Sequence, residues 1–245
     1  MHIPNGFLDP KVSAGTAFAA ATVLGYCVAK VRQALASLVP ESVLAGAGNI
    51  AANITDGSKK MISSLAENHI MKMGAVASLI FAAQMFNFPI ADGTSGHLLG
   101  GIIAAIALGP FSGAIAISIV IAVQSIFFGD GGLTALGANI LNMSVIGTLS
   151  CYYIYYIIHR LIRNKYGYYS GIAFASFFSV VLASLFCSFE IGFSRTIGLW
   201  KVLSAMIPIH ARIGIAEALL TIAALELLVL LKFGLDGIAD KSNTP

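Results

Sequence analysis

The first two residues, Met1 and His2, together with the distant His97, carry nitrogen atoms that can act together as ligands of one metal ion. The α-amine of Met1, the amide nitrogen of His2 and the His2 imidazole can close two fused chelate rings on one ion. One in-plane position stays open, and the imidazole of His97 can fill it. Four nitrogens in a plane suit Ni(II), Cu(II) or low-spin Co(II), whereas Zn(II) prefers a tetrahedron and Mg(II) prefers oxygen. The sequence therefore predicts a square-planar nitrogen site.

Turn residues surround both histidines. Residues 1–10 hold two prolines and an Asn-Gly pair, which predict a structured but non-helical plug. His97 ends a glycine-rich stretch, residues 92–97, where we expect a tight turn into a helix. No basic stretch or apolar segment of signal-peptide type opens the chain, so we expect Met1 to remain the N-terminus.

The composition is that of a membrane protein. The 245 residues are 58% hydrophobic and 10% charged, whereas charged residues make up about a quarter of a soluble domain. Several charge-free runs reach the roughly 20 residues that a helix needs to cross about 30 Å of hydrocarbon. The longest run, residues 93–129, contains Gly109-Pro110, which predicts a break into two helices. The three cysteines lie inside apolar runs, so we expect them to be small packing residues and not to form disulfides.

We expect an all-α bundle of seven transmembrane helices that forms one integral-membrane substrate-binding domain over residues 1–245. The expected spans cover about residues 11–31, 71–88, 97–108, 112–128, 133–158, 168–189 and 204–231. Residues 33–68 are expected to be a cytoplasmic loop with one or two short surface helices.

The basic residues predict the orientation of this bundle. With seven spans, most of the Lys and Arg residues fall on the side of the C-terminus, and such an excess marks the cytoplasmic face. These residues are Lys30, Arg32, Lys59, Lys60, Lys72, Arg160, Arg163, Lys165, Lys232 and Lys241. We therefore expect the N-terminus outside the cell membrane and the C-terminus in the cytoplasm.

Five further polar residues are candidates for supporting the site. Asn87, Asp92 and Asp130 lie in the two outer turns, where they could hydrogen-bond the histidine ligands and orient them. His210 and Glu217 lie two helical turns apart inside the last span, and ionisable residues within a bilayer usually face the bundle interior. They indicate either a polar network between helices or an element that couples binding to transport.

Four segments resemble the CbiM/NikM family of cobalt and nickel substrate-capture subunits of energy-coupling-factor (ECF) transporters. They are Met-His-Ile-Pro-Asn-Gly-Phe-Leu at 1–8, Asn-Phe-Pro-Ile-Ala-Asp-Gly-Thr-Ser-Gly-His-Leu-Leu-Gly-Gly at 87–101, Gln-Ser-Ile-Phe-Phe-Gly-Asp-Gly-Gly at 124–132 and His-Ala-Arg-Ile-Gly-Ile-Ala-Glu-Ala-Leu at 210–219. The resemblance implies a seven-helix bundle with the N-terminus tucked into its centre and a metal bound by Met1, His2 and His97. The family carries an acid after Pro4, where this chain has Asn5, and we expect this change to alter a turn or a hydrogen bond but no ligand.

The resemblance also implies ATP-driven uptake of Co(II) or Ni(II), for cobalamin synthesis or for nickel enzymes, with the ion as transported substrate and no cofactor. Both ions suit four planar nitrogens, so the prediction covers both. The chain contains no Gly-x-x-x-x-Gly-Lys-[Ser/Thr] phosphate loop, so we expect a transport subunit that is not itself an enzyme. The implied partners are a membrane coupling subunit, cytoplasmic ATPase subunits and a small accessory membrane subunit.

Two other classes of function are compatible with parts of the sequence. Gly93-Thr94-Ser95-Gly96 matches the Gly-x-Ser-Gly of rhomboid-type intramembrane serine proteases, with Ser95 as nucleophile and His210 as base. The motif is short, and the earlier spans lack the His-x-x-x-Asn pattern that such proteases carry. Alternatively, His210 and Glu217 could serve an ion-coupled secondary metal carrier.

Overall fold

The computed structural model describes residues 1–37, 51–85, 88–90, 94–231 and 233, and this part of the chain is mostly helical, with one pair of short strands and several non-helical connections. The helices are α1 (Pro10–Ser37), α3 (Ala51–Gln84), α4 (Gly101–Leu108), α5 (Pro110–Val123), α6 (Leu136–Ile140), α7 (Cys151–Leu161), α8 (Lys165–Phe193) and α9 (Leu199–Leu230). The strands are β1 (Phe88–Ile90) and β2 (Thr94–Gly96), which pair antiparallel. Three segments have π- or 3₁₀-helical geometry. The π-helix η2 (Gln124–Phe128) extends α5, the 3₁₀-helix η3 (Leu133–Ala135) leads into α6, and the π-helix η4 (Leu141–Ser150) joins α6 to α7.

Five helical segments of the described chain are long and apolar enough to cross a membrane, as expected for a multi-pass protein of the cell membrane. They are Pro10–Ser37, Pro110–Phe128, Leu133–Leu161, Lys165–Phe193 and Leu199–Leu230. The second predicted span lies in the C-terminal half of α3. The third coincides with α4, whose 8 residues measure about 12 Å, less than one crossing. The count of seven crossings and the sides of the two termini remain predictions.

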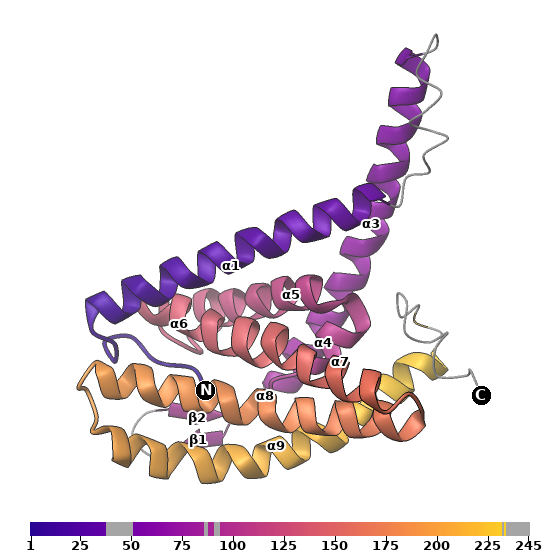
Figure 1. The fold of residues 1–245 in the computed structure, drawn as a ribbon. Helices are drawn as coiled ribbons and strands as arrows, with labels where there is room; N and C mark the ends of the chain where they lie inside the picture. The colour runs from indigo at the N-terminus through magenta and orange to yellow at the C-terminus, as the bar shows by residue number, and fades with distance from the viewer. Residues whose placement is uncertain (38–50, 86–87, 91–93, 232, 234–245) are drawn as a thin grey trace.

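Residues 33–68 contain more helix than the predicted loop with one or two short surface helices. α1 extends to Ser37, and α3 runs without a break for 34 residues from Ala51 to Gln84. Figure 1 shows the first half of α3 projecting away from the other helices. Asp56-Gly57 is typical of a turn, but one glycine costs only about 1 kcal/mol in a helix and the surrounding Ala, Lys, Met and Leu residues favour helix. Residues 38–50 lie outside the described part.

The predicted break at Gly109-Pro110 is confirmed. α4 ends at Leu108, Gly109 adopts a φ of 86°, and Pro110 is the first residue of α5. Glycine tolerates this positive φ, and proline suits a first helical position because its missing N–H would have no partner there. The two helices then pack closely, since a Cβ on Gly113 would lie 2.7 Å from the Ala105 nitrogen.

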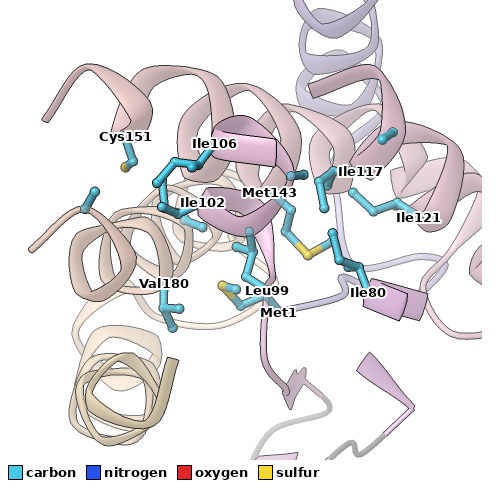
Figure 2. Packing of buried hydrophobic residues seen from close by; sticks show 14 of the residues in the cluster. Met1, Ile80, Leu99, Ile102, Ile106, Ile117, Ile121, Met143, Cys151 and Val180 are labelled. Atoms are coloured by element: carbon cyan, nitrogen blue, oxygen red, sulfur yellow. The ribbon is translucent and has the colours of Figure 1, made fainter. Parts of the chain in front are cut away.

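The N-terminal residue belongs to the buried core. The Met1 side chain has no exposed surface and shares one apolar cluster with Leu99, which precedes α4, Ile102 of α4 and Met143 of η4 (Figure 2). Cys27, Cys151 and Cys187 are buried and free, as predicted. The helices therefore enclose the start of the chain, and the nitrogen atoms of Met1 and His2 lie inside the bundle.

Candidate metal site

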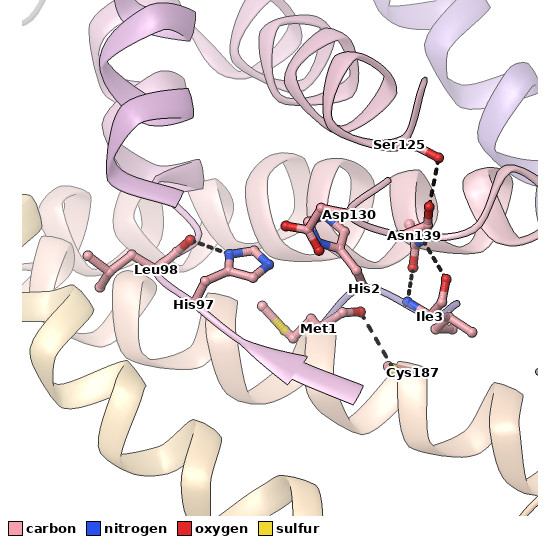
Figure 3. A network of polar contacts seen from close by, with 10 residues as sticks. Met1, His2, Ile3, His97, Leu98, Ser125, Asp130, Asn139 and Cys187 are labelled. Carbon is pink, nitrogen blue, oxygen red and sulfur yellow. Dashed lines mark hydrogen bonds and ion pairs between the residues drawn. The ribbon is translucent and has the colours of Figure 1, made fainter. Parts of the chain in front are cut away.

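Residues 1–9, which we call the plug, contain no helix and run into the bundle, as predicted. The backbone of Ile3 fixes the plug: its nitrogen donates to Asn139 Oδ1 at 2.8 Å, and its oxygen accepts from Asn139 Nδ2 at 3.2 Å. Figure 3 shows this pair of bonds. The Ile3 oxygen also accepts from the nitrogen of Gly132 at 2.8 Å. The Asn139 side chain of α6 thus bonds both backbone groups of Ile3, as a neighbouring β-strand would, and Ile3 directly follows His2.

Two glycines allow the plug to lie against the turn that follows η2. A Cβ on Gly132 would lie 2.3 Å from the nitrogen of Asn5, and a Cβ on Gly131 would lie 3.3 Å from His2 Cβ. Gly131 also adopts a φ of 93°, which side chains with a Cβ rarely accept. The predicted turn at residues 129–132 is therefore present, and two of its glycines, Gly131 and Gly132, contact the plug.

The side chain of Asn5 acts as a hydrogen-bond acceptor. Its Oδ1 accepts from the nitrogen and from the hydroxyl of Thr134, each at 3.0 Å. The side chain of Ser13 also donates to the backbone oxygen of Thr134. The contacts of Asn5 agree with the expectation that the change from an acid concerns a hydrogen bond.

His97 reaches the site through the hairpin of β1 and β2. Phe88 pairs with Gly96 and Ile90 with Thr94, so the strands return the chain toward α3 before His97. A short non-helical segment then leads to Gly100, whose φ of 71° starts α4. His97 thus precedes α4, whereas we had predicted that it would lie in the first turn of that helix.

The imidazoles of His2 and His97 lie face to face. Their ring centroids are 4.7 Å apart, and their planes are 26° from parallel. Both residues are buried, and Nε2 of each ring has no hydrogen-bond partner among the described residues. Nδ1 of His97 lies 2.7 Å from the oxygen of Leu98, which can only accept, so Nδ1 carries the proton. The lone pair of His97 is therefore on Nε2, which suits a metal ligand.

Asp130, predicted as a residue that supports the site, contacts His2. Its Oδ1 lies 2.9 Å from His2 Nδ1, and Figure 3 shows the His97 ring directed toward this pair. Nδ1 is the ring nitrogen that can close a chelate ring with the amide nitrogen of the same residue. A metal bound at Nδ1 would lie next to the Asp130 carboxylate, whose negative charge favours a cation there.

Burial favours the unprotonated form of the predicted ligands. It lowers the pKa of the Met1 α-amine from 8.0 to about 6, although Cys187 and Asp130 oppose this shift. It lowers the pKa of His2 against the opposing hydrogen bond of Asp130, and it lowers the pKa of His97 further, with the α-amine adding to the effect. The lone pairs are therefore available to a metal near neutral pH, because metal ions compete with protons for them.

His210 and Glu217 are buried in α9, as predicted for interior-facing residues. Nδ1 of His210 lies 2.7 Å from the oxygen of Met206, and its Nε2 has no partner in the described part of the chain. The Glu217 carboxylate accepts from the backbone at the start of α4. Asn87, Asp92 and the side chain of Ser95 lie outside the described residues.

Side chains alone do not form a metal site in the described residues, where no three His, Cys, Asp or Glu groups come close enough to share an ion. Two imidazoles with backbone nitrogens are therefore the arrangement to consider. The sequence reasoning assigned no plug contact to Asn139. An amide seven residues after the Gly-Asp-Gly-Gly turn was the only signal for it.

Comparisons with known proteins agree with these observations. Residues 2–233 match the family described as cobalt uptake substrate-specific transmembrane region. A protein of Archaeoglobus fulgidus named as a fused nickel transport protein is 35% identical over 224 residues, which cover 90% of this chain and 63% of the relative. This chain thus spans less than two thirds of that relative. A protein of Haloquadratum walsbyi named as a metal transport protein is 34% identical, with 90% of this chain and 86% of the relative covered.

Solved structures show the same fold. The crystal structure of a truncated transition metal transporter has a TM-score of 0.66 and 28% identity, and the match covers 94% of this chain and 99% of the other. A second transition metal transporter gives a TM-score of 0.65 with 27% identity. With matches over nearly its whole length, the chain belongs to the CbiM family of substrate-specific transmembrane regions.

Proposed function

We propose that this chain is the membrane-embedded substrate-binding subunit for ATP-driven uptake of Ni(II) or Co(II). One observation carries the proposal: the plug brings Met1 and His2 into the bundle, next to the buried His97 imidazole. The names of the relatives, which include nickel and cobalt transport proteins, support the class of substrate. They also favour a transport subunit over an enzyme.

The proposed ligands are the Met1 α-amine, the deprotonated amide of His2, Nδ1 of His2 and Nε2 of His97. Because a metal binds an imidazole in the plane of the ring, the two stacked rings must turn relative to each other when the ion enters. The resulting plane of nitrogens rejects Zn(II) and Mg(II) by geometry. Raw affinity would favour copper, so preference for Ni(II) or Co(II) also depends on which metals are available.

The transport cycle then begins with capture from outside. In this proposal the bundle crosses the membrane seven times, with the N-terminus outside and the C-terminus in the cytoplasm. Release to the inside requires a membrane coupling subunit and cytoplasmic ATPase subunits, assisted by a small accessory membrane subunit. The positive-inside distribution of Lys and Arg supports this orientation.

The test is Ni(II) titration calorimetry on the purified full chain with His2→Ala and His97→Ala. Each variant should bind Ni(II) more than about 100-fold more weakly, beyond the usual effect of a residue outside the ligand set. His159→Ala is the matched control, since His159 stacks on Tyr155 in α7 and supplies no proposed ligand. Parental affinity in either His2→Ala or His97→Ala would rule out the site.

Two further measurements separate this proposal from the alternatives. A Ser95→Ala variant should still import metal, whereas a rhomboid-type protease would lose its activity. Uptake in cells that lack the ATPase partners should stop, whereas an ion-coupled carrier would continue to import metal.

A further inference from the structure

The segment from His97 to Gly100 is attached to α9 through one carboxylate. The nitrogen of Leu99 donates to Glu217 Oε2 at 2.8 Å, and the nitrogen of Gly100 donates to Oε1 at 2.6 Å. Both oxygens of Glu217 therefore hold neighbouring peptide groups, 118 and 117 residues away in the sequence. The first of these groups lies two residues after His97.

The surroundings of Glu217 explain why a carboxylate is placed there. Its side chain is 2% exposed, and a buried carboxylate requires strong donors. The backbone just before α4 supplies them, because Gly100 is the residue that caps α4 and Leu99 precedes it. Glu217 thus accepts from α9 the N–H groups of the two residues through which the chain enters α4.

The same segment is held from the side of α3. Gln84 Nε2 donates to the oxygen of Leu99 at 2.6 Å. The His97 imidazole bonds to the oxygen of Leu98 at 2.7 Å, so the ring orientation follows the backbone of this segment. Any shift at Leu99 is therefore transmitted to the imidazole over two residues.

We propose that Glu217 is a positioning residue of the metal site: its carboxylate fixes the backbone at Leu99 and Gly100 so that the His97 imidazole meets the plug. This inference rests on the proposed function, since it assumes that His97 binds the transported ion. It also identifies α9 as the helix whose displacement would move His97 away from Met1 and His2.

Glu217→Gln is the sharpest perturbation. Glutamine has nearly the same size, but it offers one oxygen acceptor, and its NH₂ group would face the N–H of either Leu99 or Gly100. Two donors cannot share a hydrogen bond, so one of the two contacts must be lost. Glu226→Gln is the matched control, because Glu226 lies on the same helix and accepts a hydrogen bond from the Tyr169 hydroxyl at 2.9 Å, away from α4.

The experiment uses the full chain in detergent, with Ni(II) calorimetry for affinity and Cu(II) as a spectroscopic probe. Electron paramagnetic resonance of bound Cu(II) counts the nitrogen ligands. We expect Glu217→Gln to bind Ni(II) about 10- to 100-fold more weakly and to show three nitrogens, as His97→Ala should. The parent protein and Glu226→Gln should show four nitrogens. Glu217→Asp keeps both oxygens and should have an affinity between those of the parent and Glu217→Gln.

Several outcomes would overturn the inference. Glu217→Gln could keep parental affinity, or it could lose affinity while Cu(II) still reports four nitrogens, which is the result expected from a general loss of stability. Failure of both Glu217→Gln and Glu217→Asp to fold would assign the residue to stability alone. Parental binding by His2→Ala would instead refute the metal site itself. Loss in His2→Ala with parental behaviour of Glu217→Gln refutes only the role of Glu217.

Discussion

Replacing Gly132 with alanine should displace the plug and weaken metal binding. The new Cβ would lie 2.3 Å from the nitrogen of Asn5 and 2.6 Å from the carbonyl carbon of Pro4, whereas ordinary contacts begin at 3.4 Å. The difference between 3.4 and 2.3 Å requires a shift of about 1.1 Å. Distances in a metal site are held to about 0.2 Å, so a shift of this size at Asn5 disrupts the position of His2, the proposed ligand three residues earlier.

The expected magnitude follows from the cost of the overlap. Forcing an extra methyl group into a packed site costs about 1–3 kcal/mol. The variant can avoid this cost by releasing the plug, but metal binding needs the plug in place. The cost then appears in the affinity for Ni(II), which should fall about 5- to 150-fold, since each 1.4 kcal/mol is a factor of ten.

The assay combines Ni(II) calorimetry with labelling of the Met1 α-amine by an amine-reactive reagent. In Gly132→Ala the amine should react faster because the displaced plug exposes it. Gly15→Ala is the control, since a Cβ at Gly15 in α1 meets nothing within 4 Å. Parental affinity together with a protected amine in Gly132→Ala would refute the argument that the plug must be seated for metal to bind.

Three other predictions follow from the same geometry. One residue added before Met1 moves the amine about 3.8 Å along the chain, so Ni(II) binding should be lost while circular dichroism shows an unchanged helix content; retained binding would exclude the amine as a ligand. Lowering the pH should weaken Ni(II) binding about tenfold per pH unit above pH 6, because the His2 amide releases one proton when the metal binds. Below pH 6 the affinity should fall more steeply, because the Met1 amine, with a pKa of about 6, becomes protonated and must release a second proton. Calorimetry in buffers of different ionisation enthalpy counts the released protons, and a count that stays constant with pH would contradict the assignment. Asn139→Leu leaves the buried Ile3 nitrogen without its acceptor, which should cost about 1–3 kcal/mol and lower both the melting temperature and the Ni(II) affinity, whereas unchanged values would show that Asn139 does not hold the plug.

The pairing of Met1 with His2 as chelating residues could be proposed from the sequence because it depends on short-range chemistry. Met1 and His2 are adjacent, so their chelating nitrogens need no tertiary information. The break at Gly109-Pro110 is likewise a local rule of backbone geometry. Burial of the N-terminus was predicted only through resemblance to a family.

Long-range pairings and helix lengths could not be inferred in the same way. The bonds of Ile3 to Asn139 and of Leu99 to Glu217 join residues 136 and 118 positions apart, and no periodicity marks such partners. The apolar residues before Gly109 fit a full crossing as well as they fit the short α4 with its non-helical entry. The N-terminal half of α3 was missed because it contains Asp56-Gly57, a pair that also occurs in turns.

The hydrogen bonds between Ile3 and Asn139 also set an order of events during synthesis. The peptide that carries Ile3 leaves the ribosome long before Asn139, and the backbone oxygen of Met1 meets the thiol of Cys187 only after most of the polypeptide has been inserted. The earliest residues to be made are thus among the last to be locked in place. A chain truncated before α8 would consequently lack the contact that Cys187 makes with Met1.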